Sequence, residues 1–398
     1  MNTVLNYLKN KVLYLVLALL MSFIGSVYAQ QEILVAANKT QSYLPLLKEK
    51  KIGLVVNATS VIFKDDTYIH LVDSLLAHRV NIKTIFSPEH GFRTDADAGE
   101  KIQDEIDSKT GLPIVSLYGK NRKPTSEQLE DLDLVVFDIQ DVGVRFYTYI
   151  ATLQLVMEAC AENNIPLIVF DRPNPNGSYI DGPVLEKKHS SFLGLNEIPL
   201  VYGMTIGEYA NMLKGEKWLR VDSDLDLRII PLEGYTHQSS YHIPIKPSPN
   251  LPNDQSIGLY PSLGLFEGTN VNAGRGTPYQ FSRFGASFLD NTYFYFSYTP
   301  HPNKGSKYPK EDGKLCYGRD LSTVEIPNKV SLKWLMEAYE NSIDKNAFFI
   351  TSGFTRHAGT ELLQQQIEKG LTEDQIRMSW QKDINIFKSI RKKYLLYP

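Results

Sequence analysis

Short apolar runs that alternate with helical segments constrain the fold of this chain more than any other feature. Five runs rich in β-branched and other apolar residues are predicted to be strands, and they cover residues 51–57, 81–87, 113–117, 132–139 and 165–171. Two segments between them, Tyr68–Ala77 and Tyr149–Asn163, carry apolar residues at helical spacing. Because nearly continuous apolar strands that alternate with helices are typical of a parallel sheet covered on both faces, the sequence predicts a doubly wound α/β domain.

The composition of the chain changes after about Pro231. Proline, tyrosine and glycine become dense, and Thr292–Tyr298 is an aromatic run that favours a strand. Helical patterns follow at Leu332–Tyr339 and Gln364–Tyr394. We therefore expect two closely packed domains, an α/β domain over residues 30–231 and a smaller α+β domain over residues 232–398.

The first 29 residues have the pattern of a cleavable export signal. Lys9 and Lys11 are their only charges, and an apolar run, Val12–Val27, leads to a small-residue end before Gln30. The alternative is an uncleaved anchor, but the run falls short of the roughly 20 residues that span a bilayer. We expect residues 1–29 to be a signal peptide and the mature protein to be periplasmic or secreted, without a stable membrane span.

Charge and cysteine usage exclude several functions. The chain has 42 Lys+Arg against 45 Asp+Glu, so it offers no polycationic surface and we expect no nucleic-acid partner. Nucleotide-binding glycine motifs are absent and the eight histidines form no close ligand pair, so we expect no cofactor and no metal. Of the two cysteines, Cys160 lies on the apolar face of a predicted helix, which favours a buried free thiol over a disulfide with Cys316.

Polar side chains follow three of the predicted strands, where ligands bind in open parallel sheets. These residues are Glu89 and His90 after the second strand, Asp141, Arg145 and Tyr147 after the fourth, and Asp171 and Arg172 after the fifth. Such a set suits sugar chemistry, which needs a protonated carboxyl group and often a second one. Each also has a structural alternative: Glu89 could cap a helix, Asp171 and Arg172 could form an internal ion pair, and Arg145 and Tyr147 could pack.

A second informative stretch runs from Pro247 to Thr277. Its prolines fix an extended course and its glycines allow close backbone approach, while Glu267, Asn270 and Arg275 supply polar ends. A loop of this kind is more often functional than idle, although it could simply brace the second domain.

Several strings resemble the NamZ-type exo-β-N-acetylmuramidases. They are FSPEHGFR with DADAGE, TGLPIVSLYG, VVFDIQDVGVRFYTYI, VFDRPNPNG with DGPVLE, IPLVYGMTIGEYA, KPSPNLP and LGLFEGTNVNAGRGT. The resemblance implies a Rossmann-like catalytic domain and an auxiliary domain that closes a cleft. It also implies cofactor-free hydrolysis of terminal β-linked N-acetylmuramic acid (MurNAc) from the non-reducing end of peptidoglycan fragments.

The resemblance also assigns roles to individual residues. It makes Glu89 the principal catalytic carboxyl, and we expect it to act as the general acid. The second catalytic group is left open among Asp141, Glu267 and the acetamido group of the substrate. The expected substrate-binding residues are His90, Arg145, Tyr147, Asn270 and Arg275, with Arg145 or Arg275 pairing with the lactyl carboxylate.

The main alternative function is a non-catalytic, exported binding protein for cell-wall sugars. A two-domain body with an aromatic-rich cleft would serve either role. The carboxyl groups at the strand ends favour the enzyme, because a binding protein needs amides and stacking rings but no isolated carboxyl such as Glu89.

Overall fold

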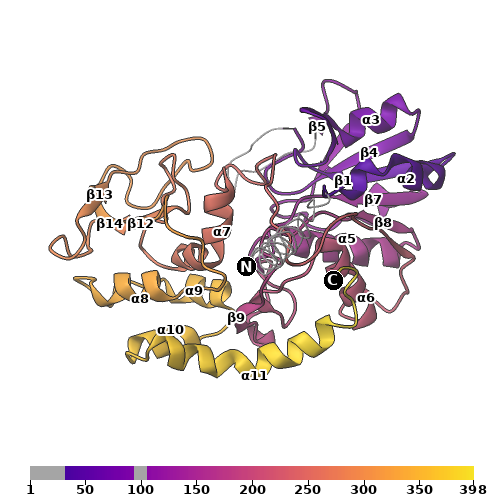
Figure 1. Cartoon of the computed structure of the whole chain (residues 1–398). Coiled ribbons are helices and arrows are strands. Elements are labelled where there is room, and N and C mark those ends of the chain that lie inside the picture. Colours follow the sequence, from indigo (N-terminus) through magenta and orange to yellow (C-terminus); the bar gives the residue numbers. More distant parts are fainter. Residues whose placement is uncertain (1–31, 94–104) are drawn as a thin grey trace, which may run out of the picture.

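The computed structural model describes residues 32–93 and 105–398. The expected signal peptide and the DADAGE string at 95–100 lie outside these residues. Figure 1 shows two lobes, with the larger sheet in one, a small sheet and short helices in the other, and a long helix running beneath both.

The larger lobe is built on a seven-stranded sheet. Its strand order is β11-β8-β7-β1-β4-β6-β5, and all neighbouring pairs are parallel except β5 with β6. The strands are β1 (Lys51–Val56), β4 (Asn81–Ser87), β5 (Glu105–Ile106), β6 (Pro113–Ser116), β7 (Leu134–Asp138), β8 (Leu167–Phe170) and β11 (Leu227–Ile230). The five predicted strands are confirmed. Strands β4 and β6 follow β1 on one side of it, and β7, β8 and β11 follow on the other side. This reversal of strand order next to β1 is typical of a Rossmann-like sheet.

Helices cover both faces of this sheet, as predicted. Successive residues of β1 face opposite ways: Leu54 and Val56 belong to one buried cluster, and Val55 belongs to the other. The first cluster includes residues of η1 (Ala36–Asn38), α2 (Thr40–Leu47) and α3 (Leu71–Ala77). The second includes residues of α4 (Ser126–Leu129), α5 (Tyr149–Glu162) and α6 (Ile206–Gly215).

The helix expected over Tyr68–Ala77 begins later than predicted. Residues Thr67–His70 form β3, which pairs in an antiparallel hairpin with β2 (Val61–Lys64). His70 then ends the strand and starts the helix, because its Nδ1 accepts a hydrogen bond from the backbone N–H of Val72. The prediction was wrong for this first turn because strand pairing outweighed the helical spacing.

The smaller lobe carries a three-stranded antiparallel sheet in the order β12-β14-β13. These strands are β12 (Arg283–Ala286), β13 (Phe296–Tyr298) and β14 (Cys316–Asp320), so only the end of the expected 292–298 strand pairs. Its helices are α7 (Asp254–Leu263), η3 (Gly264–Gly268), α8 (Lys333–Glu340), α9 (Thr351–Ala358) and α10 (Leu362–Glu368). The connections include β9 (Asp181–Val184), η2 (Lys187–His189) and β10 (Pro199–Val201), which lie between β8 and α6 in the sequence.

The two lobes share buried structure. One hydrophobic cluster contains Phe137 of β7 together with Phe266 of η3 and Phe284 of β12. Helix α11 (Glu373–Arg391) extends along both lobes and brings the C-terminus beside α6 (Figure 1). The boundary expected at 231 stays a prediction.

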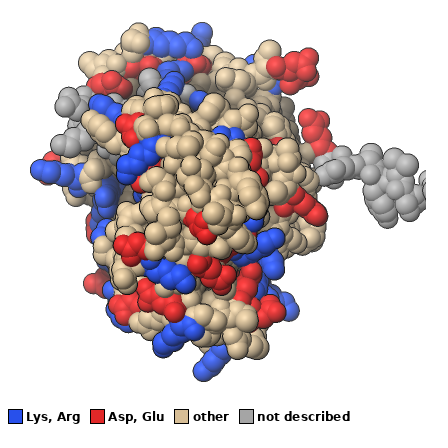
Figure 2. Space-filling view, turned by 90° about the vertical axis from the view of Figure 1, so that its left-hand side faces the viewer, with Lys and Arg blue, Asp and Glu red and all other residues tan. Residues whose placement is uncertain are grey.

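Both cysteines are free and buried, and the buried free thiol expected at Cys160 is confirmed. Within residues 32–93 and 105–398, no helix is both long and apolar enough to cross a membrane. On the face that Figure 2 displays, Lys and Arg side chains are interspersed with Asp and Glu rather than gathered in one area.

Candidate active site

A small pocket lies where loops of the sheet meet the second lobe. We call it the Glu89 pocket. Its volume is about 150 Å³. Its walls are formed by Glu89, His90, Phe146, Tyr147, Thr148, Tyr149, Leu193, Ser248, Asn250, Leu251, Tyr260, Glu267, Arg275, Phe281 and His357. The structure therefore brings together Glu89, His90, Tyr147, Glu267 and Arg275 of the predicted set.

Glu89 reaches the pocket because the chain turns sharply after β4. His90 and Gly91 both have positive φ, 75° and 82°, and the Gly91 N–H donates to the Pro88 carbonyl at 3.2 Å. This turn directs Glu89 toward the start of α5, where the Thr148 hydroxyl donates to its Oε2 at 3.0 Å. Thr148 thus holds one carboxyl oxygen in place at the pocket wall.

Glu267 enters the pocket from η3 and is held in an ion pair. Its Oε2 lies 2.9 Å from Nη1 of Arg275. Burial alone would raise the pKa of Glu267, but the charges of Arg275 and Lys310 outweigh burial and hold the pKa below its usual range. Glu267 is therefore a carboxylate at neutral pH and is poorly suited to donate a proton.

Two tyrosines fasten the proline-rich loop over the pocket. The hydroxyls of Tyr147 and Tyr149 donate to the Pro247 carbonyl at 2.7 and 3.1 Å. The Asn57 side-chain amide in turn donates to the Tyr149 oxygen at 2.9 Å. Burial raises the pKa of both phenols, so they remain neutral donors.

His357 of α9 is a pocket residue that the sequence analysis missed. Its Nδ1 lies 2.9 Å from the Gly353 carbonyl, so Nδ1 carries the proton and Nε2 is an acceptor. Burial lowers the pKa of this imidazole, which keeps it neutral. It comes from the part of the chain with the weakest motifs, and no local signal distinguishes it.

Asp141 does not line the pocket, in contrast to its predicted catalytic place. Its Oδ2 accepts from the Gly143 N–H at 2.7 Å and from the Tyr202 hydroxyl. The side chain is buried, and burial raises its pKa to about 6. Its carboxyl thus fixes the loop after β7 and does not face substrate.

Arg145 is also turned away from the pocket. Its guanidinium is buried and donates to four backbone carbonyls. These are Pro183 at 2.8 Å, Ile198 at 2.9 Å, His357 at 3.0 Å and Ala358 at 2.7 Å. Arg145 therefore joins the β9 and β10 segments to the end of α9, and the packing alternative replaces the predicted substrate contact.

Asn270 is exposed and lies outside the pocket walls. Its side-chain amide donates to the Ala347 carbonyl at 2.6 Å, and its backbone N–H donates to the Phe348 carbonyl at 2.9 Å. These contacts tie η3 to the segment before α9. We therefore do not assign Asn270 to substrate binding.

The residues after β8 are structural. Arg172 forms a buried ion pair with Asp138, with Nε at 2.5 Å and Nη2 at 2.8 Å from the two carboxylate oxygens. Asp171 accepts from the hydroxyls of Thr205 and Tyr397 at 2.7 and 2.6 Å. An internal ion pair was anticipated here, but the partner of Arg172 is Asp138.

The described residues contain no group of three His, Cys, Asp or Glu side chains placed to hold a metal ion. The ionisable groups that line the Glu89 pocket include its two carboxyls, the Arg275 guanidinium and the neutral imidazole of His357.

Comparisons with known proteins cover nearly the whole chain. Family models described as exo-beta-N-acetylmuramidase NamZ match residues 52–255 with the N-terminal part and residues 258–397 with the C-terminal part. Peptidoglycan beta-N-acetylmuramidase NamZ of Bacillus subtilis (strain 168) is 38% identical over 381 residues, or 89% of each chain.

Two crystal structures of DUF1343 family proteins from Bacteroides fragilis are similar to this fold. One is 41% identical with a TM-score of 0.84, and the other is 30% identical with a TM-score of 0.76. Each match covers 92% of this chain and 99% of the other. Together with the family models, these similarities show that the chain belongs to the exo-β-N-acetylmuramidase NamZ family.

Proposed function

We propose that this protein is an exo-β-N-acetylmuramidase that releases terminal β-linked MurNAc from the non-reducing end of peptidoglycan fragments such as MurNAc-GlcNAc, where GlcNAc is N-acetylglucosamine. The observation that carries the proposal is the pair of carboxyls with different surroundings in one pocket. Glu89 is contacted by a neutral hydroxyl, whereas Glu267 is held ionised by Arg275. Glycoside hydrolysis generally uses two carboxyl groups, one as the acid and one as base or nucleophile.

In this mechanism Glu89 is the general acid. It gives a proton to the glycosidic oxygen as the sugar gains oxocarbenium character. The Glu267 carboxylate either accepts a proton from attacking water or orients the acetamido group of the substrate. The anomeric configuration of the released sugar, observed by NMR, separates these two roles of Glu267.

The size and charge of the pocket support a terminal muramic acid as substrate. At about 150 Å³ the pocket is smaller than the roughly 300–1,000 Å³ of typical ligand sites, so it has no room for more than one sugar ring. Two cations, Arg275 and Lys310, lie close enough to the one Glu267 carboxylate to lower its pKa. The surroundings of Glu267 therefore carry a net positive charge. We assign the lactyl carboxylate to Arg275, since a guanidinium can bind it through two charge-assisted hydrogen bonds. Arg275→Ala should therefore reduce the preference for muramic over glucosamine chromogenic glycosides.

The decisive test is product analysis of MurNAc-GlcNAc incubated with the purified protein. We expect equal amounts of free MurNAc and GlcNAc. Glu89→Gln should lower the rate by about 10²–10⁴-fold, because that is the usual contribution of a positioned acid. Glu130→Gln is the matched control, because Glu130 is exposed and does not line the Glu89 pocket. Binding of the disaccharide without cleavage by the wild type would instead support the sugar-binding alternative.

We also propose that the protein acts outside the cytoplasm, after removal of residues 1–29. The basic start, apolar run and small-residue end of this segment support the proposal. Mass spectrometry of the extracytoplasmic protein should find Gln30 near its amino terminus, and an intact terminus in the membrane fraction would contradict it.

A further inference from the structure

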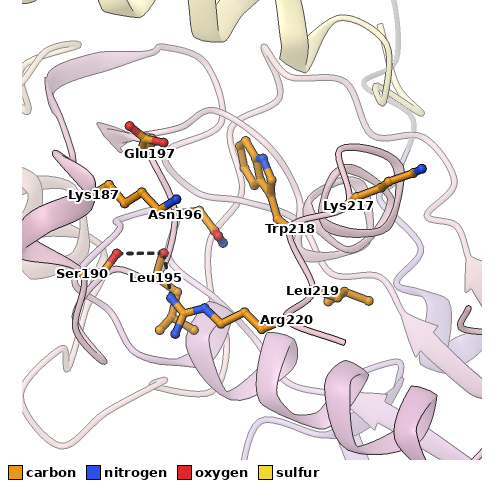
Figure 3. Close-up of a pocket in the computed structure, with 9 residues that line it drawn as sticks. All are labelled: Lys187, Ser190, Leu195, Asn196, Glu197, Lys217, Trp218, Leu219 and Arg220. Atoms are coloured by element: carbon orange, nitrogen blue, oxygen red, sulfur yellow. Dashed lines mark hydrogen bonds between the residues drawn. The ribbon is translucent and has the colours of Figure 1, made fainter. Parts of the chain in front are cut away.

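A second, larger pocket has no assigned role, and one chain segment, residues 193–195, contributes to its wall and to the wall of the Glu89 pocket. We call it the Trp218 pocket (Figure 3); its volume is about 490 Å³. One wall comes from η2, with Lys187, and from the segment between η2 and β10, with Asn196. The other wall comes from the segment after α6, with Lys217, Trp218 and Arg220.

Buried polar side chains of α5 hold both walls in place. Gln154 accepts a hydrogen bond from the Asn196 amide at 2.7 Å and donates to the Trp218 carbonyl at 3.1 Å. Glu158, one turn further along, accepts from the backbone N–H of Arg220 at 3.1 Å. Both α5 side chains are buried in a helix that is otherwise almost wholly apolar. Because burying polar groups is costly unless they are hydrogen-bonded, these contacts indicate a built pocket and not a surface irregularity.

The Trp218 pocket is positively charged. Lys187, Lys217 and Arg220 line it together with one acidic residue, Glu197. Within residues 32–93 and 105–398, none of the three cations has an ion-pair partner. The indole of Trp218 is only partly buried. In Figure 3, Lys187 and Arg220 lie to one side of this indole, whereas the Lys217 side chain points away from the pocket.

The two pockets are close enough to hold one extended ligand. Leu193 lines the Glu89 pocket and Leu195 lines the Trp218 pocket, so only Gly194 lies between these wall residues, whose Cα atoms are at most about 7 Å apart. Helix α5 links them as well. Thr148 at its start contacts Glu89, and Gln154 lies about 9 Å further along the helix axis.

We propose that the Trp218 pocket binds the remainder of a longer glycan on the leaving-group side of the scissile bond. A pyranose ring packs on the Trp218 indole, and the carboxylate of that sugar lies between Lys187 and Arg220, which point to the same side of the pocket (Figure 3). This inference rests on the proposed function, because the bound sugar must be part of the chain that Glu89 cleaves. It makes the enzyme sensitive to the length of its substrate.

Kinetics on two peptide-free substrates test the proposal. We compare kcat/KM for MurNAc-GlcNAc and for the tetrasaccharide MurNAc-GlcNAc-MurNAc-GlcNAc. Trp218→Ala and the double variant Lys187→Glu/Arg220→Glu should each lower the ratio of tetrasaccharide to disaccharide kcat/KM by about fivefold or more. The effect of the charge variant should shrink as salt rises. Lys382→Glu, a charge reversal on the exposed side of α11, is the control and should leave the ratio unchanged.

A binding measurement separates failure of this inference from failure of the proposed function. Calorimetric titration of the Glu89→Gln protein with the tetrasaccharide needs no turnover, and adding Trp218→Ala should weaken binding by the same factor. If the wild type cleaves the disaccharide but the variants affect both substrates equally, or neither, the glycan site is wrong while the enzyme assignment stands. If only fragments that carry stem peptides lose affinity, the pocket binds acidic peptide and the glycan proposal is overturned.

Discussion

At the scale of single residues, Glu89 and Asp141 show what a strand-end pattern can and cannot predict. Both follow strands of the sheet, and both were expected at one rim. The left-handed turn at His90 and Gly91 directs Glu89 into the pocket, whereas Asp141 turns inward to Gly143 and Tyr202. A strand end fixes where a residue lies along the sheet edge, but the direction of its side chain depends on partners far along the chain.

The burial of Asp141 predicts how its amide replacement behaves. Burial raises its folded-state pKa to about 6, above the unfolded value of roughly 3.9. The acid form thus stabilises the fold fully below pH 4, and this contribution is lost as pH rises to 6. Because Oδ2 accepts both hydrogen bonds and Oδ1 has no partner among the described residues, Asp141→Asn can keep both contacts.

We expect Asp141→Asn to raise the free energy of unfolding by about 1–3 kcal/mol at pH 7.5 and to match the wild type near pH 4. Urea denaturation at both pH values measures this difference. Disaccharide turnover should stay within a fewfold of the wild type. A loss of activity as large as that of Glu89→Gln would return Asp141 to the catalytic group.

At the scale of elements, local patterns predicted the sheet well and long-range contacts poorly. The apolar run at β1 was sufficient to identify a buried strand, and α5 begins at Tyr149 as predicted. The hairpin strand β3 was missed because it exists only through pairing with β2. His357 could not be found from the sequence, since α9 reaches the Glu89 pocket by packing against η3 and by the bonds of Arg145 to its last carbonyls.

Arg145 should matter through α9 and not through direct substrate contact. Arg145→Met removes the donor of four hydrogen bonds, and of the accepting carbonyls that of Ile198 keeps the Leu185 N–H as a donor. We therefore expect a loss of roughly 3–5 kcal/mol in the free energy of unfolding. Because the bonds to residues 357 and 358 fix the end of α9, kcat/KM should also fall. Denaturant unfolding and disaccharide kinetics measure the two effects.

Arg356→Met, on the exposed side of the same helix, is the control for Arg145→Met and should change stability by less than about 0.5 kcal/mol. The substrate-contact alternative makes a different prediction. If Arg145→Met kept full stability and lost only the preference for muramic over glucosamine glycosides, the guanidinium would have to reach the lactyl group.

At the scale of the whole molecule, the two lobes do not correspond to two continuous parts of the sequence. The C-terminal family model covers residues 258–397, yet Tyr397 packs in the cluster beneath the sheet of the first lobe. Its hydroxyl donates to Asp171 at 2.6 Å and accepts from the Leu232 N–H at 2.9 Å. The last residues of the chain are thus part of the first lobe, and composition alone could not reveal this return.

This shared core predicts that the two lobes unfold together. Residues of both lobes belong to one hydrophobic cluster, so exposing either lobe would also expose buried surface of the other. Scanning calorimetry should show a single transition in which the calorimetric and van't Hoff enthalpies agree.

Tyr397→Phe removes the buried donor to Asp171 and should lower the midpoint temperature of this transition by a few °C without splitting it. Tyr394→Phe, which loses a hydrogen bond to Glu216 nearer the surface, should shift it less. Two separate transitions would mean that the lobes are independent folding units joined only at the Glu89 pocket.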